Sequence, residues 1–202
     1  MFKPGLPTLL LVAPAYKSYR PILRPFFDSL PRPFSWKFDS GPRTQGSNKV
    51  GLVIDVLINV GQGWKTTGNE AYAKKDIALA LESYTHGIEH LDYTLKEYGL
   101  KMKLDKSDTV RKLLAVFLAN RAAVYLWDSK EFSPQKAEED GRRSEDADPA
   151  YAKAYYRQAR AHECLGDIAK ARNVLNRALR REELKNDTGV RQELDKYLMM
   201  AM

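Results

Sequence analysis

Small residues recur along most of this chain at intervals typical of closely packed helices. Gly68 and Ala80 stand twelve residues apart, and a tyrosine follows each of them four residues later, Tyr72 and Tyr84. A small side chain in one helix lets a second helix approach closely, so this spacing predicts a helical hairpin. Hairpins that repeat in this way stack into an elongated array, with small residues between the helices and a concave groove along one side.

The pattern predicts two further hairpins and a closing helix. The second helix of the first repeat is expected at residues 77–98. Gly87 replaces a more usual alanine there, which lowers helix stability by about 1 kcal/mol. The second repeat is expected to open near Thr109 and to contain a turn about three residues longer than the pattern. Ser133 and Pro134 are predicted as the N-cap and first residue of its second helix. The third repeat carries small or turn residues at Ala159, Gly166, Asp167, Ala171 and Ala178.

A last helix is predicted at residues 188–199, where four apolar residues share one face. We expect it to cover the open end of the stack. Those residues are Val190, Leu194, Tyr197 and Leu198.

The first 63 residues have a different composition. Eight of the ten prolines lie between Pro4 and Pro42, which argues against regular helices there. This part holds eight basic and three acidic residues, so it accounts for +5 of the net charge of +7. The remainder is nearly neutral, and the charge does not indicate nucleic-acid binding. We therefore expect residues 1–63 to be a flexible basic leader and residues 64–200 to form the domain.

Two stretches of the leader are apolar. The apolar run at 9–13 is too short to cross a bilayer, which takes about 20 residues, and a secretory signal or a mitochondrial presequence stays open for the leader. The apolar segment 50–60 is predicted as an added helix or strand that covers the first repeat.

The single cysteine, Cys164, is expected inside helix packing. One cysteine suits a reducing compartment, so we expect a cytoplasmic protein.

Residues 64 to about 200 resemble the three-repeat tetratricopeptide (TPR) domains of co-chaperones. Besides the small residues, the resemblance rests on the segments Trp64-Lys-Thr-Thr-Gly-Asn69, Leu118-Ala-Asn120 and Ala152-Lys-Ala-Tyr-Tyr-Arg157. It implies an all-α fold in which three TPR helix-turn-helix repeats and a C-terminal capping helix form a right-handed superhelical solenoid.

In that family, five polar residues form a carboxylate clamp that binds the Glu-Glu-Val-Asp tails of the seventy- and ninety-kilodalton heat-shock chaperones. The matching residues here are Lys65, Asn69, Asn120, Lys153 and Arg157. Cations pair with the carboxylates of such a tail, and asparagine amides fix its orientation. The resemblance thus implies a monomeric, non-enzymatic adaptor without a cofactor. A TPR scaffold for an unrelated peptide is the alternative.

One enzyme motif competes with this interpretation. His86-Gly-Ile-Glu-His90 has the H-x-x-E-H spacing of a zinc metallopeptidase, which would use His86, Glu89 and His90. A third ligand is not evident, so we expect two exposed histidines and no enzyme. The mixed charge run at 138–148 is predicted as the solvated face of a helix. No phosphate loop or serine–histidine–acid arrangement accompanies these motifs.

Overall fold

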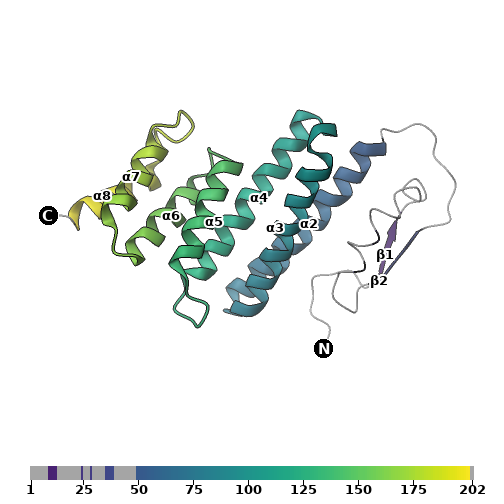
Figure 1. The fold of residues 1–202 in the computed structure, drawn as a ribbon, viewed down its shortest axis with the longest axis horizontal. Coiled ribbons are helices and arrows are strands. Elements are labelled where there is room, and N and C mark those ends of the chain that lie inside the picture. The colour runs from purple at the N-terminus through teal and green to yellow at the C-terminus, as the bar shows by residue number, and fades with distance from the viewer. Residues whose placement is uncertain (1–8, 13–23, 25–27, 29–34, 39–48, 201–202) are drawn as a thin grey trace.

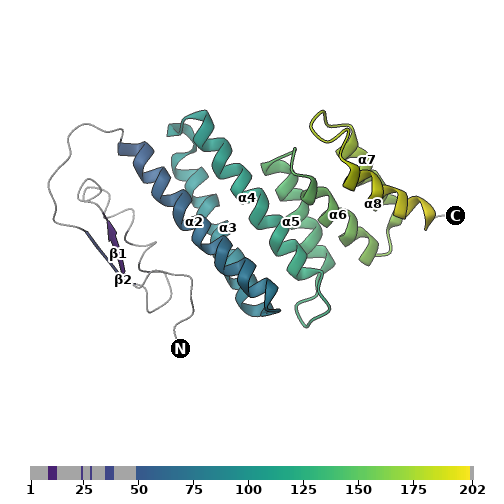
Figure 2. The ribbon, with the colours of Figure 1, turned by 180° about the vertical axis from the view of Figure 1, so that it is seen from behind.

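Seven α-helices follow one another between Lys49 and Met199 in the part of the chain that the structure describes. The structure is a computed structural model that describes residues 9–12, 24, 28, 35–38 and 49–200. Figures 1 and 2 show the helices in a row in chain order, which confirms the predicted array. They are α2 (Lys49–Ala73), α3 (Ile77–Tyr98), α4 (Leu104–Tyr125), α5 (Pro134–Ala147), α6 (Ala152–Cys164), α7 (Ile168–Leu179) and α8 (Thr188–Met199).

The helices pair into three hairpins, and the first helices of the hairpins also contact one another. Helix α2 packs on α3, α4 on α5 and α6 on α7, while α2 contacts α4 and α4 contacts α6. We call α2, α4 and α6 the first-helix layer and α3, α5 and α7 the second-helix layer. Helix α8 packs on α7 and α6 and closes the row. This arrangement follows from small residues that let each pair approach closely.

Aspartates begin three of the helices. A carboxylate oxygen of Asp76 accepts the N–H of Leu79 at 3.0 Å, and Asp187 accepts the N–H of Val190 at 2.8 Å. Asp167 does the same for α7. Such bonds satisfy donors that a helix leaves unpaired in its first turn. Ser133 is the N-cap of α5 with Pro134 following, as predicted, but its side chain makes no capping bond.

The core is continuous between α2, α3 and α4 and has a second part around α6, α7 and α8. Leu91, Phe117 and Leu118 are fully buried in the first part. Val190 and Tyr197 are fully buried in the second, which confirms α8 as a capping helix. Leu198 was predicted on the same covered face, but 42% of it is exposed.

The apolar segment 50–60 is the first half of α2. Ile54 and Leu57 are 1% and 3% exposed, because they pack into the core with α3 and α4. Helix α2 has 25 residues and α3 and α4 have 22 each, whereas α5 to α8 have 12 to 14. The domain boundary expected at residue 64 therefore lies inside a helix.

Most of residues 1–48, the expected flexible leader, lie outside the described residues. Within them the structure shows two short strands, β1 (Leu9–Val12) and β2 (Ser35–Phe38), which pair in parallel with Leu9 opposite Ser35. The sequence pattern did not predict this pairing. Among the described helices, none has the length and apolar character needed to cross a membrane.

Candidate functional site

All five residues of the predicted clamp lie in the first-helix layer. Lys65 and Asn69 are on α2, Asn120 is on α4, and Lys153 and Arg157 are on α6. Residues four apart on a helix share one face and are separated by about 6 Å along the axis. Each of α2 and α6 thus presents two clamp residues on one face, with α4 between them.

The two asparagines contact each other across the layer. The amide nitrogen of Asn120 donates a hydrogen bond to Oδ1 of Asn69 at 3.1 Å, and the Tyr84 hydroxyl donates to the same oxygen at 2.9 Å. Burial raises the pKa of Tyr84 to about 12, so this hydroxyl keeps its proton at neutral pH. Because both donors occupy the amide oxygen, the NH₂ group of Asn69 is left to donate to a ligand.

The three cations of the predicted clamp have no carboxylate partner among the residues that the structure describes. Within the described part of the chain, no ion pair involves Lys65, Lys153 or Arg157, whereas Arg121, Arg143 and Arg177 are all paired. The Nε atom of Arg157 is also buried without a hydrogen-bond partner. Cations that the fold leaves unpaired on one layer are available to pair with an anion from outside.

On α2 and α4, the residue next to a clamp residue contacts a helix of the second-helix layer. A Cβ atom at Gly68 would lie 2.4 Å from the Tyr84 ring, so glycine beside Asn69 is what allows Tyr84 to reach the amide. Beside Asn120, Arg121 makes two hydrogen bonds of 2.8 Å to the Asp140 carboxylate. These contacts fix the rotation of α2 and α4 about their axes.

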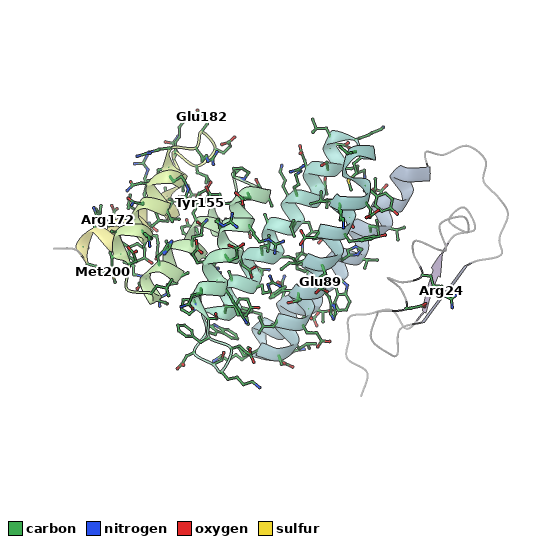
Figure 3. The ribbon with its side chains drawn as sticks, viewed as in Figure 1. Arg24, Glu89, Tyr155, Arg172, Glu182 and Met200 are labelled. Atoms are coloured by element: carbon green, nitrogen blue, oxygen red, sulfur yellow. The ribbon has the colours of Figure 1, made fainter. Side chains whose placement is uncertain are left out.

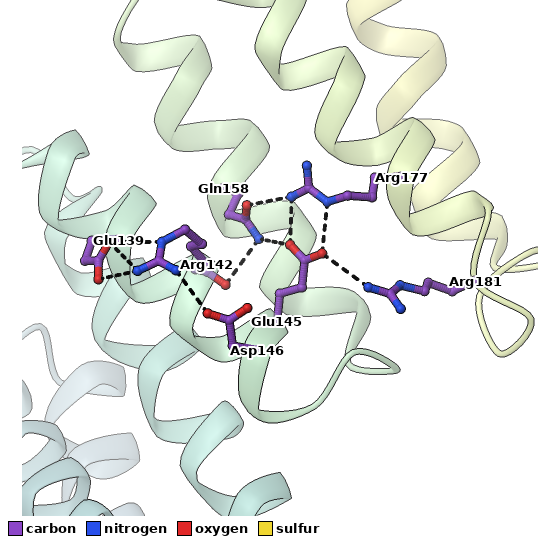
Figure 4. A network of polar contacts seen from close by, with 8 residues as sticks. Glu139, Arg142, Glu145, Asp146, Gln158, Arg177 and Arg181 are labelled. Atoms are coloured by element: carbon purple, nitrogen blue, oxygen red, sulfur yellow. Dashed lines mark hydrogen bonds and ion pairs between the residues drawn. The ribbon is translucent and has the colours of Figure 1, made fainter.

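On α6 the residue beside Arg157 belongs to a buried polar network (Figure 4). Gln158 donates to Glu145 at 3.0 Å and accepts from Arg177 at 3.0 Å. Arg177 also makes hydrogen bonds of 2.9 and 2.7 Å to the Glu145 carboxylate. The network joins α5, α6 and α7 and holds α6 in the orientation that presents Lys153 and Arg157.

The charge run at 138–148 is only partly a solvated face, contrary to prediction. Asp140, Ser144 and Glu145 are buried. Burial favours a higher pKa for Glu145, but hydrogen bonds from Arg177 and Gln158 outweigh this and lower its pKa. The helical pattern shows which residues share a face. It does not show that partners on α4, α6 and α7, which are far away in the sequence, form hydrogen bonds with these buried polar groups.

An aromatic pair close to the clamp was not predicted as part of the site. The rings of Tyr72 and Trp127 stack with centroids 4.4 Å apart and planes at 17°. Tyr72 lies three residues after Asn69, and Trp127 lies seven residues after Asn120. Both side chains are half-buried. Tyr72 is one turn beyond Asn69 on α2, whereas Trp127 lies in the turn that follows α4, which ends at Tyr125.

The histidines of the H-x-x-E-H motif do not form a ligand pair. His90 is 5% exposed, and its Nε2 lies 2.7 Å from the carbonyl oxygen of Leu57. Burial lowers the pKa of His90. His86 lies against the Trp64 ring with centroids 5.2 Å apart, and Glu89 is exposed on α3 (Figure 3). The expectation of two exposed histidines was wrong for His90, and no group of three potential metal ligands occurs among the described residues.

The prediction for Cys164 was also wrong. Its side chain is exposed at the end of α6 rather than buried between helices. The residue is the last of α6, and the helix stops before a turn at Gly166, whose φ is +77°. A residue at a helix end has fewer neighbours than the same residue one turn earlier, which explains the exposure.

Comparison with known structures agrees with this architecture. No protein-family model matches the chain. The first TPR of Spaghetti (RPAP3) bound to the HSP90 peptide SRMEEVD is similar, with 22% identity, a TM-score of 0.51 and coverage of 70% of this chain and 94% of that one. The first TPR domain of human RPAP3 has 21% identity, a TM-score of 0.53 and coverage of 71% and 94%.

The TPR2B domain of yeast Sti1, in its pHsp70 complex, gives corresponding values of 23% identity and a TM-score of 0.51, with 69% of this chain and 97% of that one covered. The match extends over nearly the whole length of each of these domains. The fold of this chain is therefore that of a TPR solenoid domain.

Proposed function

We propose that this chain is an adaptor that binds the acidic C-terminal tail of a heat-shock chaperone of the seventy- or ninety-kilodalton class. The observation that carries the proposal is the set of five residues in the first-helix layer. Two of them, Asn69 and Asn120, contact each other, and the three cations lack carboxylate partners among the described residues. The ligand of this site is the terminal carboxylate together with an acidic side chain.

Chemistry supports the choice of ligand. Lys65, Lys153 and Arg157 supply three positive charges, which match two carboxylates that lie close together. The NH₂ group of Asn69 is available to donate to the same ligand, because its amide oxygen already accepts two hydrogen bonds. Two of the similar domains are in complexes with chaperone ligands, an HSP90 peptide for Spaghetti and pHsp70 for Sti1. Transfer of that ligand to this chain is part of the proposal.

Titration with a synthetic acidic peptide tests the terminal carboxylate. We expect a peptide ending in Glu-Glu-Val-Asp to bind as the free acid and to lose at least about tenfold in affinity when its C-terminus is amidated, because one anion is removed. Calorimetry measures both forms at the same salt concentration. Equal affinities would show that the site binds an internal peptide segment, which is the alternative of an unrelated partner.

Paired substitutions test the site residues. Lys153→Ala and Arg157→Ala should each weaken free-acid binding by at least about tenfold. Lys96→Ala and Arg180→Ala are matched controls, since both cations are exposed and form no ion pair within the described residues. Lys96 lies on α3 and Arg180 is the C-cap of α7, so both belong to the second-helix layer. They should leave the affinity unchanged. If a control weakens binding as much as its partner, the peptide responds to overall charge and the clamp assignment fails.

We also propose that the adaptor acts in the cytoplasm without catalysing a reaction. The single cysteine is compatible with a reducing compartment. The clamp residues bind and orient a peptide, and no step in this role requires a cofactor.

A further inference from the structure

The two most exposed large apolar side chains of the described residues lie together where α3 is connected to α4. Leu100 is 106% exposed and Leu104 is 79% exposed, whereas Leu91 and Phe117 in the same two helices are fully buried. We call residues 99–106 the α3–α4 tip, which consists of the 3₁₀ turn Gly99–Lys101 and the start of α4. Large apolar side chains gathered in contact with water mark a surface that binds something else.

The tip is held in place by its neighbours in the chain. The N–H of Met102 donates to the carbonyl of Tyr98 at 2.9 Å. Tyr98 is 7% exposed, and Met102 packs partly buried against the same core. Leu100 and Leu104 are therefore exposed because the fold directs them outward, since the residues between and before them are anchored in the core.

Lysines alternate with the apolar residues of the tip. The sequence from residue 100 reads Leu-Lys-Met-Lys-Leu, and residues 96–106 contain four lysines and two acidic residues. Lys103 is exposed and forms no ion pair among the described residues, while Lys106 pairs with Asp55 on α2. Apolar side chains flanked by cations match an apolar layer beneath negatively charged headgroups, which is the surface of an anionic membrane.

The basic leader joins the domain at the same end. Figures 1 and 2 show the start of α2 and the tip at one end of the helices, and the ion pair between Asp55 and Lys106 joins the two helix starts. Residues 1–48 contain seven basic and two acidic residues. A positively charged segment is thus attached where the tip lies, which favours an anionic surface as the partner.

We propose that the α3–α4 tip docks the protein on a membrane surface that contains anionic lipids. Leu100 and Leu104 enter the apolar layer, and the ammonium group of Lys103 stays at the level of the headgroups. A lipid layer deforms around a protruding side chain, whereas a protein partner would need a matching pocket. The docking does not rest on the clamp, because Asn120 lies about 24 Å farther along α4 than Leu104. Membrane and peptide can therefore be bound at the same time.

Co-sedimentation of the full chain with lipid vesicles tests the docking. We expect binding to phosphatidylcholine vesicles that contain about one-third phosphatidylserine, and at least about tenfold weaker binding to phosphatidylcholine alone, because each lysine near an anionic surface contributes about fivefold. Leu100→Ser combined with Leu104→Ser should weaken binding to the anionic vesicles by at least about tenfold, because burial of the apolar side chains is lost. Lys103→Gln should weaken it by about threefold to fivefold.

Two matched controls separate the tip from general surface character. Met199→Ser combined with Met200→Ser removes apolar side chains that are 76% and 54% exposed at the other end of the array. Lys130→Gln removes a cation that is exposed in the turn after α4 and forms no ion pair among the described residues. Both should stay within about twofold of the wild type in vesicle binding. Circular dichroism checks that every variant is folded.

An added tryptophan reports directly on insertion. In Leu100→Trp, anionic vesicles should shift the emission to shorter wavelength by more than they shift that of the wild type, because the indole leaves water. Met199→Trp should show no shift beyond that of the wild type.

The outcomes separate this proposal from the clamp. Absence of binding to the anionic vesicles overturns the docking, and so does equal binding to phosphatidylcholine alone. If the protein with Leu100→Ser and Leu104→Ser binds as tightly as the wild type, another segment makes the contact and the tip assignment is wrong. The clamp is tested by peptide titration without lipid, so failure of one proposal leaves the other standing.

Discussion

At the scale of single residues, Gly87 shows how a residue that lowers the stability of its own helix is required by packing against another helix. A Cβ atom at this position would lie 2.1 Å from the ring of Phe117, which is fully buried on α4. Helix propensity alone does not explain a glycine in the middle of α3. The structure shows that it makes room for the aromatic ring that joins α3 to α4.

Gly87→Ala should therefore destabilise the fold although alanine favours helices. We expect the free energy of unfolding to fall by about 1–3 kcal/mol, because the Phe117 ring cannot move without disturbing the core. Gly63→Ala is the matched control, since a Cβ atom there meets nothing within 4 Å and should stabilise α2 by about 0.5–1 kcal/mol. Urea unfolding measures both. A neutral or stabilising Gly87→Ala would contradict the packing argument.

Single residues also mark the limit of sequence reasoning about the site. The pattern located Lys65, Asn69, Asn120, Lys153 and Arg157 on first-layer helices, because their spacing is local. It did not reveal that Tyr84 and Asn120 share the oxygen of Asn69, since that contact depends on the packing of three helices. Burial of His90 and exposure of Cys164 were missed for the same reason.

At the scale of elements, helix ends with a capping aspartate were the most predictable. The predicted ranges of α3 and α8 agree with the structure, and Asp76 and Asp187 cap their first turns. The start of α4 was expected near Thr109 but lies at Leu104, and its N-cap position makes no side-chain bond. Where no residue caps the helix, the sequence does not define where it begins.

The network between α5, α6 and α7 makes stability depend on pH. The pKa of Glu145 is lowered in the folded state by its partners, so it contributes stability that is present above the unfolded pKa of about 4.3 and is lost as the pH falls through the folded value. Glu145→Gln should cost about 2 kcal/mol at pH 7 and progressively less below pH 4.

Denaturation of both proteins between pH 3 and 7 checks this difference. Glu139→Gln is the control, because this exposed carboxylate pairs with Arg142 inside the same helix. Its effect should stay within about 0.5 kcal/mol at every pH. A difference between wild type and Glu145→Gln that stays constant across the range would show that the carboxylate charge is not what stabilises the network.

At the scale of the whole molecule, the first half of α2 belongs to the folded domain. Ile54 and Leu57 are buried in the core that α2 shares with α3 and α4. A fragment starting at residue 49 should retain the folded repeats and the affinity for a free-acid tail. A fragment starting at residue 64 should lose more than about 4 kcal/mol of stability, because two large apolar side chains are removed.

Thermal unfolding and peptide titration of the two fragments measure this difference. The comparison tests the division of the chain as well. If the fragment from residue 49 fails to fold, part of residues 1–48 is needed for the repeats. If the fragment from residue 64 is as stable as the longer one, the first half of α2 is an appendage.

The unequal helix lengths also set a gradient of local opening along the array. In repeat proteins each hairpin is held only by its neighbours, so the ends open more readily than the middle. Here the N-terminal end is reinforced by long helices with a shared core, while the C-terminal end has α8, from which Met199 and Met200 are exposed. Amide protons of α8 and α7 should therefore exchange with solvent fastest and those of α3 and α4 slowest. Exchange would then be intermediate in α6, so the helix that carries two of the cations would be more mobile than those that carry the asparagines.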